Sequence, residues 1–162
     1  MANEISLDDY QALAEFRYQI RRFLHFSEQV ARSAGIEPQQ HQLLLALKSK
    51  PEEKAATISY LADRLQLQHH STVELIDRLV ERNLVQRRKD ETDQRRVIID
   101  MTPHGEQVLQ ELSLYHRNEL RTMGPDLAHA LNALTLDRTI STGTAEDISS
   151  SSQRGKNDTK RG

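Results

Sequence analysis

The sequence contains no cysteine and no tryptophan, and only 4% of its 162 residues are aromatic. Without cysteine the chain can form no disulfide, no zinc site with thiolate ligands and no cysteine-based redox sensor. It also lacks a glycine-rich phosphate loop, and its serine, histidine and acidic residues show no spacing typical of a hydrolase. The composition therefore argues against an enzyme, and we expect no cofactor.

Long apolar runs are also missing. No segment approaches the roughly 20 residues needed to cross a bilayer, and residues 1–11 are polar and acidic, unlike a signal peptide. These features predict a cytoplasmic protein that does not associate with membranes. The hydrophobic fraction of 36% beside 28% charged residues indicates one helical domain with much solvated surface, or with apolar faces buried in a dimer.

Apolar residues recur at helical spacing in the N-terminal third of the chain. Residues 7–33 predict one long helix that ends at Gly35, and Pro38 suits the first turn of a second helix. Four leucines within residues 43–47 cover more than one side of that second helix. We therefore expect the second helix to be buried on two sides.

The C-terminal part of the chain predicts two more helices and a tail. Thr102 and Pro103 form a helix start, with a hydroxyl N-cap followed by proline at the first helical position. The pair Gly124-Pro125 is expected to end this fifth helix and to separate it from a sixth one over residues 127–134. Residues 139–162 are rich in serine and threonine and poor in apolar residues, which predicts a disordered tail.

The centre of the chain has a different pattern. A short amphipathic helix over residues 58–65 and a three-residue link lead into a fourth helix that runs to about Arg82. Two short helices joined so tightly are typical of a helix-turn-helix, whose second helix enters the major groove of DNA. Asn83, a common residue at a left-handed helix end, stops the fourth helix.

A basic hairpin follows this fourth helix. An extended segment begins at Leu84, becomes basic at residues 87–89, passes through a polar turn and returns through the β-branched residues 97–99. Four acids and seven cations lie between residues 78 and 96, so this region is positive inside a chain of net charge −2. The cations are Arg78, Arg82, Arg87, Arg88, Lys89, Arg95 and Arg96. A helix that leads directly into such a hairpin suits a DNA duplex, with the helix in the major groove and the hairpin on its flank.

Three stretches of this region carry a more specific resemblance. LADRLQL begins at residue 61, VELIDRLVERNLVQR at residue 73 and DQRRVIIDMTPHGEQVL at residue 93. They resemble the first helix, the recognition helix and the distal wing strand of the MarR family of winged helix-turn-helix regulators. The resemblance covers residues 58–109, where Gln66 replaces the glycine usual in the family's turn.

The resemblance implies a mainly α fold with a small β-hairpin wing, in which N- and C-terminal helices form a homodimer. This domain would occupy residues 1–138, with the polar tail over residues 139–162. The implied function is a dimeric, sequence-specific regulator of transcription, acting as a repressor. Its partner would be double-stranded DNA with a pseudo-palindromic operator whose half-sites lie about 34–36 Å apart.

The expected DNA-binding residues fall into groups with different chemistry. The start of the fourth helix is assigned to base edges, which the side chains of Gln68, His69, His70, Ser71 and Glu74 can pair with. A polar helix start without a special role is the alternative. Adjacent side chains on a helix diverge by about 100°, so His69 and His70 do not predict a metal site.

The hairpin residues are assigned to the backbone and the minor groove. By resemblance, Arg95 enters the minor groove and Asp93 orients it; the alternative is a surface ion pair. Phosphates are assigned to Arg87, Arg88, Lys89 and Arg96, and Arg78 can reach one as well. Asp77 is expected to hold neighbouring cations and not to contact DNA.

The sequence leaves alternatives for a small-molecule cleft and for the role of the winged domain. Members of the family commonly bind amphipathic or phenolic effectors, and Tyr10, Tyr18, Arg22, His25 and Phe26 are candidates to line such a cleft or to serve as ordinary core residues. The winged domain is also compatible with a protein-interaction module or a non-specific architectural DNA binder, because a fold alone does not fix a function.

Overall fold

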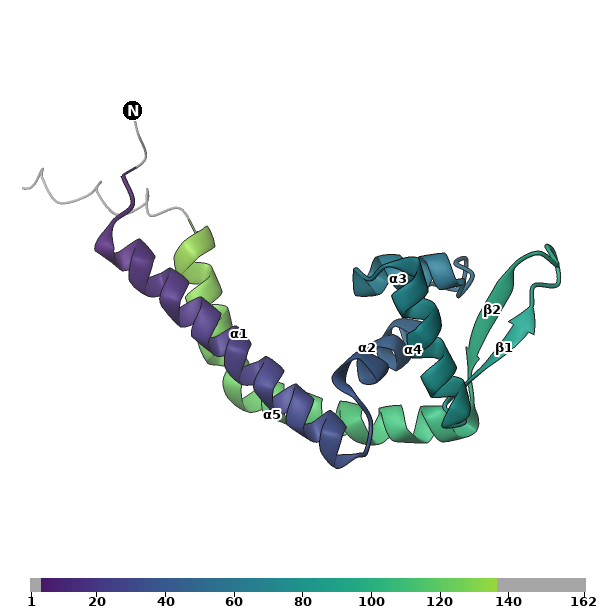
Figure 1. Cartoon of the computed structure of the whole chain (residues 1–162). Coiled ribbons are helices and arrows are strands. Elements are labelled where there is room, and N and C mark those ends of the chain that lie inside the picture. The colour runs from purple at the N-terminus through teal and green to yellow at the C-terminus, as the bar shows by residue number, and fades with distance from the viewer. Residues whose placement is uncertain (1–3, 137–162) are drawn as a thin grey trace, which may run out of the picture.

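The computed structural model describes residues 4–136, so the expected tail over residues 139–162 lies outside the described residues. The elements follow the order α1 (Leu7–Ser33), α2 (Pro38–Lys48), α3 (Ile58–Leu65), α4 (His69–Glu81), β1 (Val85–Lys89), β2 (Val97–Met101) and α5 (Pro103–Thr135). Helices α1 and α5 form a long arm that projects from a body made of α2, α3, α4, the hairpin and the start of α5 (Figure 1). The expected mainly α fold with a hairpin wing is confirmed.

Local capping explains the bounds of α1. At its start the Ser6 hydroxyl accepts a hydrogen bond from the Asp9 N–H (3.2 Å), while the Asp9 carboxylate accepts one from the Ser6 N–H (2.8 Å). At its end Gly35 takes a positive φ of 75°, and the Ile36 N–H donates to the Ala31 carbonyl (3.0 Å). The predicted helix over residues 7–33, with Gly35 as its terminator, is therefore confirmed.

The turn between α3 and α4 is made without glycine. Gln66 adopts the left-handed conformation (φ 53°, ψ 41°), and the Leu67 N–H donates to the Ala62 carbonyl (2.9 Å). A non-glycine residue in this conformation costs about 1–2 kcal/mol, which the packing of the two helices offsets. Asn83 closes α4 in the same conformation (φ 54°), as its position in the sequence predicts.

The hairpin is short and antiparallel, running from the pair Val85↔Met101 to the pair Lys89↔Val97. Its base is tied to the segment before α3, where Thr57 bridges to Ile98 and the Ile99 N–H donates to the Ala56 carbonyl (2.9 Å). A two-stranded hairpin is marginal on its own. These contacts anchor its base, and the tip extends away from the body (Figure 1).

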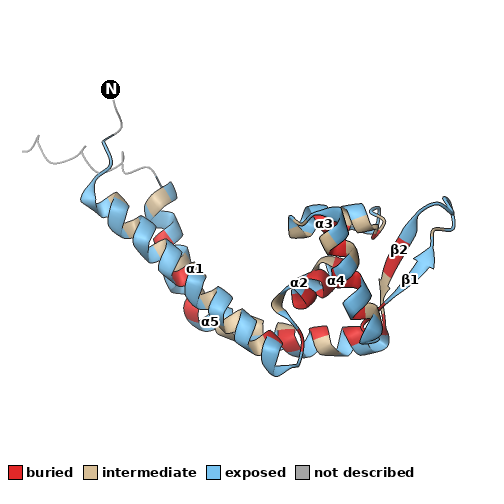
Figure 2. Cartoon of the chain, in the orientation of Figure 1, coloured by how far each residue is buried: buried red, intermediate tan, exposed pale blue. Residues whose placement is uncertain are grey.

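The core lies within the body, between α2, α4, the hairpin base and the start of α5 (Figure 2). The inward-facing apolar residues of α4 and of the hairpin base are almost fully buried there. Leu43, Leu44 and Leu47 of α2 are buried too, but the expectation of burial on two sides is wrong for Leu45, whose side chain is 47% exposed. The four leucines span a wider arc than the neighbouring elements cover.

Helix α5 corrects a second expectation. It continues through Gly124 and Pro125 to Thr135, so the predicted break and separate sixth helix are wrong. Proline removes one hydrogen bond from a helix interior, but Pro125 is exposed, and Met123 and Ala130 on either side are buried along the arm. Packing on both flanks therefore holds the helix together, and α5 curves as it follows α1 (Figure 1).

The arm differs from the body in its surface. Few of its residues are buried (Figure 2), and large apolar side chains such as Leu7, Tyr10, Tyr115 and Leu131 are exposed. Within residues 4–136, no helix is both long enough and apolar enough to span a membrane. The arm thus presents apolar side chains that the rest of residues 4–136 leaves uncovered.

Candidate nucleic-acid interface

Helix α4 is oriented by its buried face. Thr72, Leu75, Ile76 and Leu79 point into the body, and the Thr72 hydroxyl donates to the Gln68 carbonyl (3.0 Å). The opposite face is therefore turned to solvent. At its N-terminal end, the structure brings together the five residues assigned to base edges, with Ser71 half-buried and four exposed: Gln68, His69, His70 and Glu74.

The hairpin tip is ordered by its own polar residues. The backbone N–H and the hydroxyl of Thr92 both donate to the Asp90 carboxylate (2.9 Å each), and these bonds hold the pKa of Asp90 below its ordinary value. The Asp93 carboxylate accepts from the Arg95 N–H (3.1 Å), and the Asp93 carbonyl accepts from the Arg96 N–H (2.9 Å). Asp93 thus positions the backbone of Arg95.

Acidic residues neutralise several of the cations assigned to DNA. Arg87 pairs with Asp77 (2.6 Å), as expected for Asp77. The other pairs are Arg88 with Asp100, Arg96 with Asp90 (3.5 Å) and Arg78 with Glu37 (3.8 Å). Within residues 4–136, Arg95 and Lys89 form no ion pair, so the unpaired positive charge of the hairpin is concentrated at its outer end.

Two of these acidic partners have no direct signal in the sequence. Asp100 lies on the return strand, diagonally across from Arg88, which pairs in register with Ile98. Diagonal cross-strand contacts follow only once the register is known. Glu37 precedes α2 and is brought to Arg78 by the packing of α2 against α4, which local patterns do not encode.

A compact junction connects α4, β1 and α5. The Thr102 hydroxyl donates to the Asn83 carbonyl (2.6 Å) and accepts from the Gly105 N–H (3.0 Å), and the Thr102 N–H donates to the Leu84 carbonyl (3.1 Å). A Cβ atom on Gly105 would lie 2.1 Å from the Leu84 carbonyl oxygen. The Thr102-Pro103-x-Gly105 motif therefore holds the end of α4 and the start of β1 against the start of α5.

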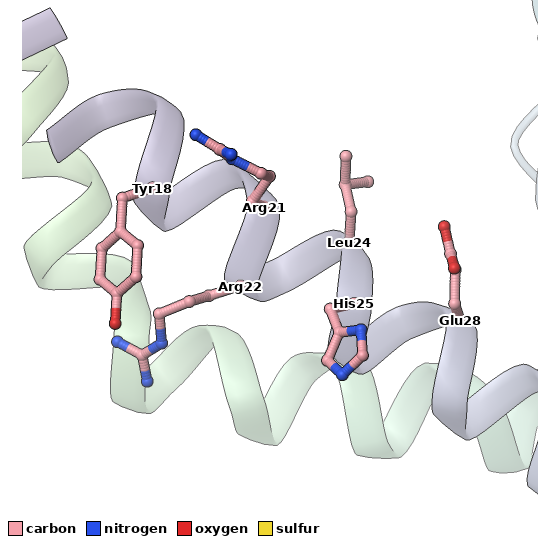
Figure 3. A pocket seen from close by; sticks show the side chains of 6 residues that line it. All are labelled: Tyr18, Arg21, Arg22, Leu24, His25 and Glu28. Carbon is pink, nitrogen blue, oxygen red and sulfur yellow. The ribbon is translucent and has the colours of Figure 1, made fainter. Parts of the chain in front are cut away.

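The effector candidates are split between two surfaces. Tyr18, Arg22 and His25 line an open pocket of about 640 Å³ together with Arg21, Leu24 and Glu28, all from α1 (Figure 3). The Arg22 guanidinium lies 5.8 Å from the centre of the Tyr18 ring. Phe26 faces α5 instead, where its ring packs edge-on against His116 (5.8 Å).

A second pocket lies where α1, α2 and α5 meet. It has a volume of about 470 Å³ and a mostly apolar lining, with Phe23, His41, Leu45, His116 and Leu120 among its residues and Arg117 and Arg121 also lining it. The imidazoles of His41 and His116 stack with their centres 4.7 Å apart. Burial, and then the nearby His116, lower the pKa of His41 to about 4.

Sequence reasoning missed this histidine pair, because the two residues are far apart in the chain and each lies within an ordinary apolar stripe. His116 is further fixed by contacts of its ring nitrogens with the Leu112 carbonyl (2.6 Å) and the Ser27 hydroxyl (2.7 Å). Across residues 4–136, no group of three or more histidine, cysteine or acidic side chains is arranged to hold a metal ion.

The geometry defines a winged helix-turn-helix protein: a helix-turn-helix, a basic hairpin directly after it, and long helices on both sides. Residues 34–96 match the family model described as MarR family. This match confirms, over residues 34–96, the resemblance to the MarR family seen in the sequence.

Two curated proteins are similar to part of the chain. An uncharacterized HTH-type transcriptional regulator, YsmB of Bacillus subtilis, is 39% identical over 67 residues, which is 41% of this chain and 46% of that protein. A putative transcriptional regulatory protein for the hcr operon of Thauera aromatica is 29% identical over 96 residues, 59% of this chain and 56% of that protein. The chain thus spans about half the length of the curated relatives it matches.

Solved structures extend the likeness of the fold to most of the chain. AbsC, a MarR family transcriptional regulator from Streptomyces coelicolor, has a TM-score of 0.66 at 20% identity, covering 81% of this chain and 91% of its own. A mutant of MepR from S. aureus, bound to an oligodeoxyribonucleotide, has a TM-score of 0.59 at 22% identity, covering 82% of this chain and 100% of its own. BpsR of Bordetella bronchiseptica, whose DNA binding is regulated by 6-hydroxynicotinic acid, has a TM-score of 0.54 at 19% identity, covering 70% of this chain and 83% of its own.

Proposed function

We propose that the chain is a dimeric, sequence-specific DNA-binding regulator of transcription that acts as a repressor. The observation that carries the proposal is the exposed N-terminal turn of α4 beside a hairpin in which Lys89 and Arg95 form no ion pair with any residue of 4–136. The match of residues 34–96 to the MarR family model supports it, and both curated relatives are described as transcriptional regulators. The similar fold of a MepR mutant bound to an oligodeoxyribonucleotide adds support.

The start of α4 is the proposed base-reading surface. Gln68 can pair bidentately with adenine, and His69 and His70 can donate to guanine or to phosphate. Glu74 lies one turn further on and would repel a phosphate, but it can accept a hydrogen bond from the N4 amine of cytosine. These residues would set the sequence preference of each half-site.

The wing is proposed to contact the flank of the half-site. Arg95 would enter the minor groove, where narrow A/T tracts concentrate negative potential. Lys89 would bind a phosphate as a free point charge. Arg78, Arg88 and Arg96 would reach phosphates while keeping their carboxylates, because a guanidinium has five donors and an ion pair uses only some of them.

The domain is proposed to comprise residues 1–138 and to act as a homodimer through the arm. Large apolar residues are exposed along α1 and α5, including Leu7, Tyr10 and Leu131, and Leu136 is exposed directly after α5. Exposed apolar patches mark interaction surfaces. A second copy packed on this surface would bury it. A twofold dimer would place two α4 helices in successive major grooves of a pseudo-palindromic operator.

The two pockets offer sites for a regulatory effector. The pocket between α1, α2 and α5 combines an apolar lining with Arg117 and Arg121, which suits an amphipathic or phenolic acid. The α1 pocket with Tyr18, Arg22 and His25 is the second candidate. A ligand in the pocket between α1, α2 and α5 would contact α5. A shift of α5 would reach the wing and α4 through the junction at Thr102–Gly105.

Competition binding tests the proposed function. A labelled duplex from the region upstream of the gene is titrated with the full chain at several salt concentrations, against unlabelled duplex of random sequence. Specific binding should exceed random binding by about 10³-fold or more, and it should weaken steeply with salt because phosphate contacts release counterions. Equal binding to both duplexes would favour an architectural binder, and no binding to either would favour a protein-interaction module.

Replacing Arg95 with alanine should weaken operator binding by about 1–3 kcal/mol and relax the preference at one flanking position. The reason is that Arg95 is proposed to read the minor groove, whereas a phosphate contact carries no sequence information. Lys89→Ala is the matched control, since it also removes one unpaired wing cation. Its loss should be the same on every flanking sequence, and an equally uniform loss for Arg95→Ala would contradict minor-groove reading.

A further inference from the structure

One ion pair crosses from the recognition helix to the wing. The Arg87 guanidinium on β1 lies 2.6 Å from the Asp77 carboxylate on α4, with side-chain exposures of 33% and 51%. Two other cations of the hairpin pair within it, Arg88 with Asp100 and Arg96 with Asp90. Among the hairpin's ion pairs in residues 4–136, only Arg87–Asp77 joins the hairpin to another element.

The pair connects an exposed position of β1 to α4. The base of the hairpin is fixed by burial of Val85, Ile98 and Ile99. On β2 burial reaches Ile98, opposite Arg88, whereas on β1 only Val85 is buried. Arg87 lies two residues beyond Val85, so its contact with α4 holds a part of β1 that burial does not fix. Beyond it, the tip that carries Arg95 extends without packing against α4 (Figure 1).

We infer that Arg87 is a positioning residue whose ion pair with Asp77 sets the angle between the wing and α4. The inference rests on the proposed function, because its consequence is that Arg95 and the start of α4 meet the duplex together. It replaces the sequence-based assignment of Arg87 to a phosphate. The Arg87 side chain is only 33% exposed, against 45–49% for the other paired arginines, Arg78, Arg88 and Arg96. Its guanidinium is therefore the least accessible of the four to a phosphate.

The expected effect is bounded by the strength of the pair. A partly exposed ion pair contributes little free energy, and it can shift the wing only by its own contribution. We therefore expect loss of the pair to lower operator affinity by about 3- to 5-fold. For Asp77→Asn, the sign of the change in operator affinity is more informative than its size. This substitution removes a negative charge near DNA, which would strengthen binding if the pair had no positioning role.

The test uses the full chain, a duplex selected by the wild-type protein from a random pool, and fluorescence anisotropy over a salt series. Asp77→Asn, Arg87→Gln and the double variant should all lose affinity. The loss in the double variant should be smaller than the sum of the two single losses, since each single substitution already removes the same pair. The slope of log affinity against log salt should stay unchanged for Arg87→Gln. Lys89→Gln is the control, and its slope should become shallower by about 0.9.

Exchange of the two charges completes the test. The Asp77→Arg, Arg87→Asp double variant should recover affinity relative to the single variants, because the pair re-forms in reverse. Unchanged or increased affinity in Asp77→Asn, together with a shallower salt slope in Arg87→Gln, would overturn the inference and make Arg87 a phosphate contact. Absence of specific binding by the wild-type chain is a separate outcome that refutes the proposed function.

Discussion

Replacing Gly105 with alanine should destabilise the fold by about 3 kcal/mol. The added Cβ would lie 2.1 Å from the Leu84 carbonyl oxygen and 2.9 Å from Met101 Cγ. The carbonyl cannot move freely, because it accepts from the Thr102 N–H at 3.1 Å. The backbone of the junction would have to shift, which would also disturb the wing. Chemical denaturation of the purified variant measures the free energy of unfolding.

Gly124→Ala is the matched control, since a Cβ there meets nothing within 4 Å. Gly124 lies inside α5, where alanine is favoured over glycine by up to about 1 kcal/mol. The two substitutions should therefore have opposite signs. Equal, small effects at both positions would show that the junction tolerates an added carbon and that Gly105 is not required for the close approach.

Acidification should destabilise the fold through His41. Its pKa is about 4 in the folded chain against 6.5 for an ordinary histidine, so between these values the unfolded chain binds a proton that the folded chain does not. The resulting stability is fully present above pH 6.5 and is lost as pH falls towards 4. At 1.36 kcal/mol per pKa unit, the loss attributable to His41 is about 2–3 kcal/mol.

The free energy of unfolding at pH 7 and at pH 4.5 measures this loss. His41→Gln should reduce the difference between the two values, because glutamine does not titrate. His129→Gln, at an exposed position of α5, should leave the difference as in the wild type. If the wild-type chain and His41→Gln lose the same free energy on acidification, the stacked pair with His116 does not govern the acid response.

The sequence predicted the elements whose signals are local. The first helix, the start of α2 at Pro38, the end of α4 at Asn83 and the start of α5 at Thr102 all follow from caps and helical periodicity. The break at Gly124-Pro125 was wrong because packing of the arm outweighs one lost hydrogen bond. Local signals cannot weigh a proline against contacts with a helix from the other end of the chain.

The candidate site, too, could be predicted from the sequence only where the signals are local. The exposed start of α4 follows from the helix pattern, because burial of Leu75, Ile76 and Leu79 leaves the opposite face to solvent. The pairing of wing cations does not follow, since Arg88 with Asp100 depends on strand register and Arg78 with Glu37 on helix packing. Counting charges in the sequence therefore overstated the free positive charge available to DNA.

The central claim is that two copies of the winged domain read one operator together. Hydroxyl-radical footprinting of the full chain on the duplex selected from a random pool tests it most directly. Two cooperating copies should protect two segments of related, inverted sequence whose centres lie about one helical turn, or 34–36 Å, apart. Further protection is expected where the wings reach the minor groove. A single protected segment, or uniform protection without sequence symmetry, would contradict it.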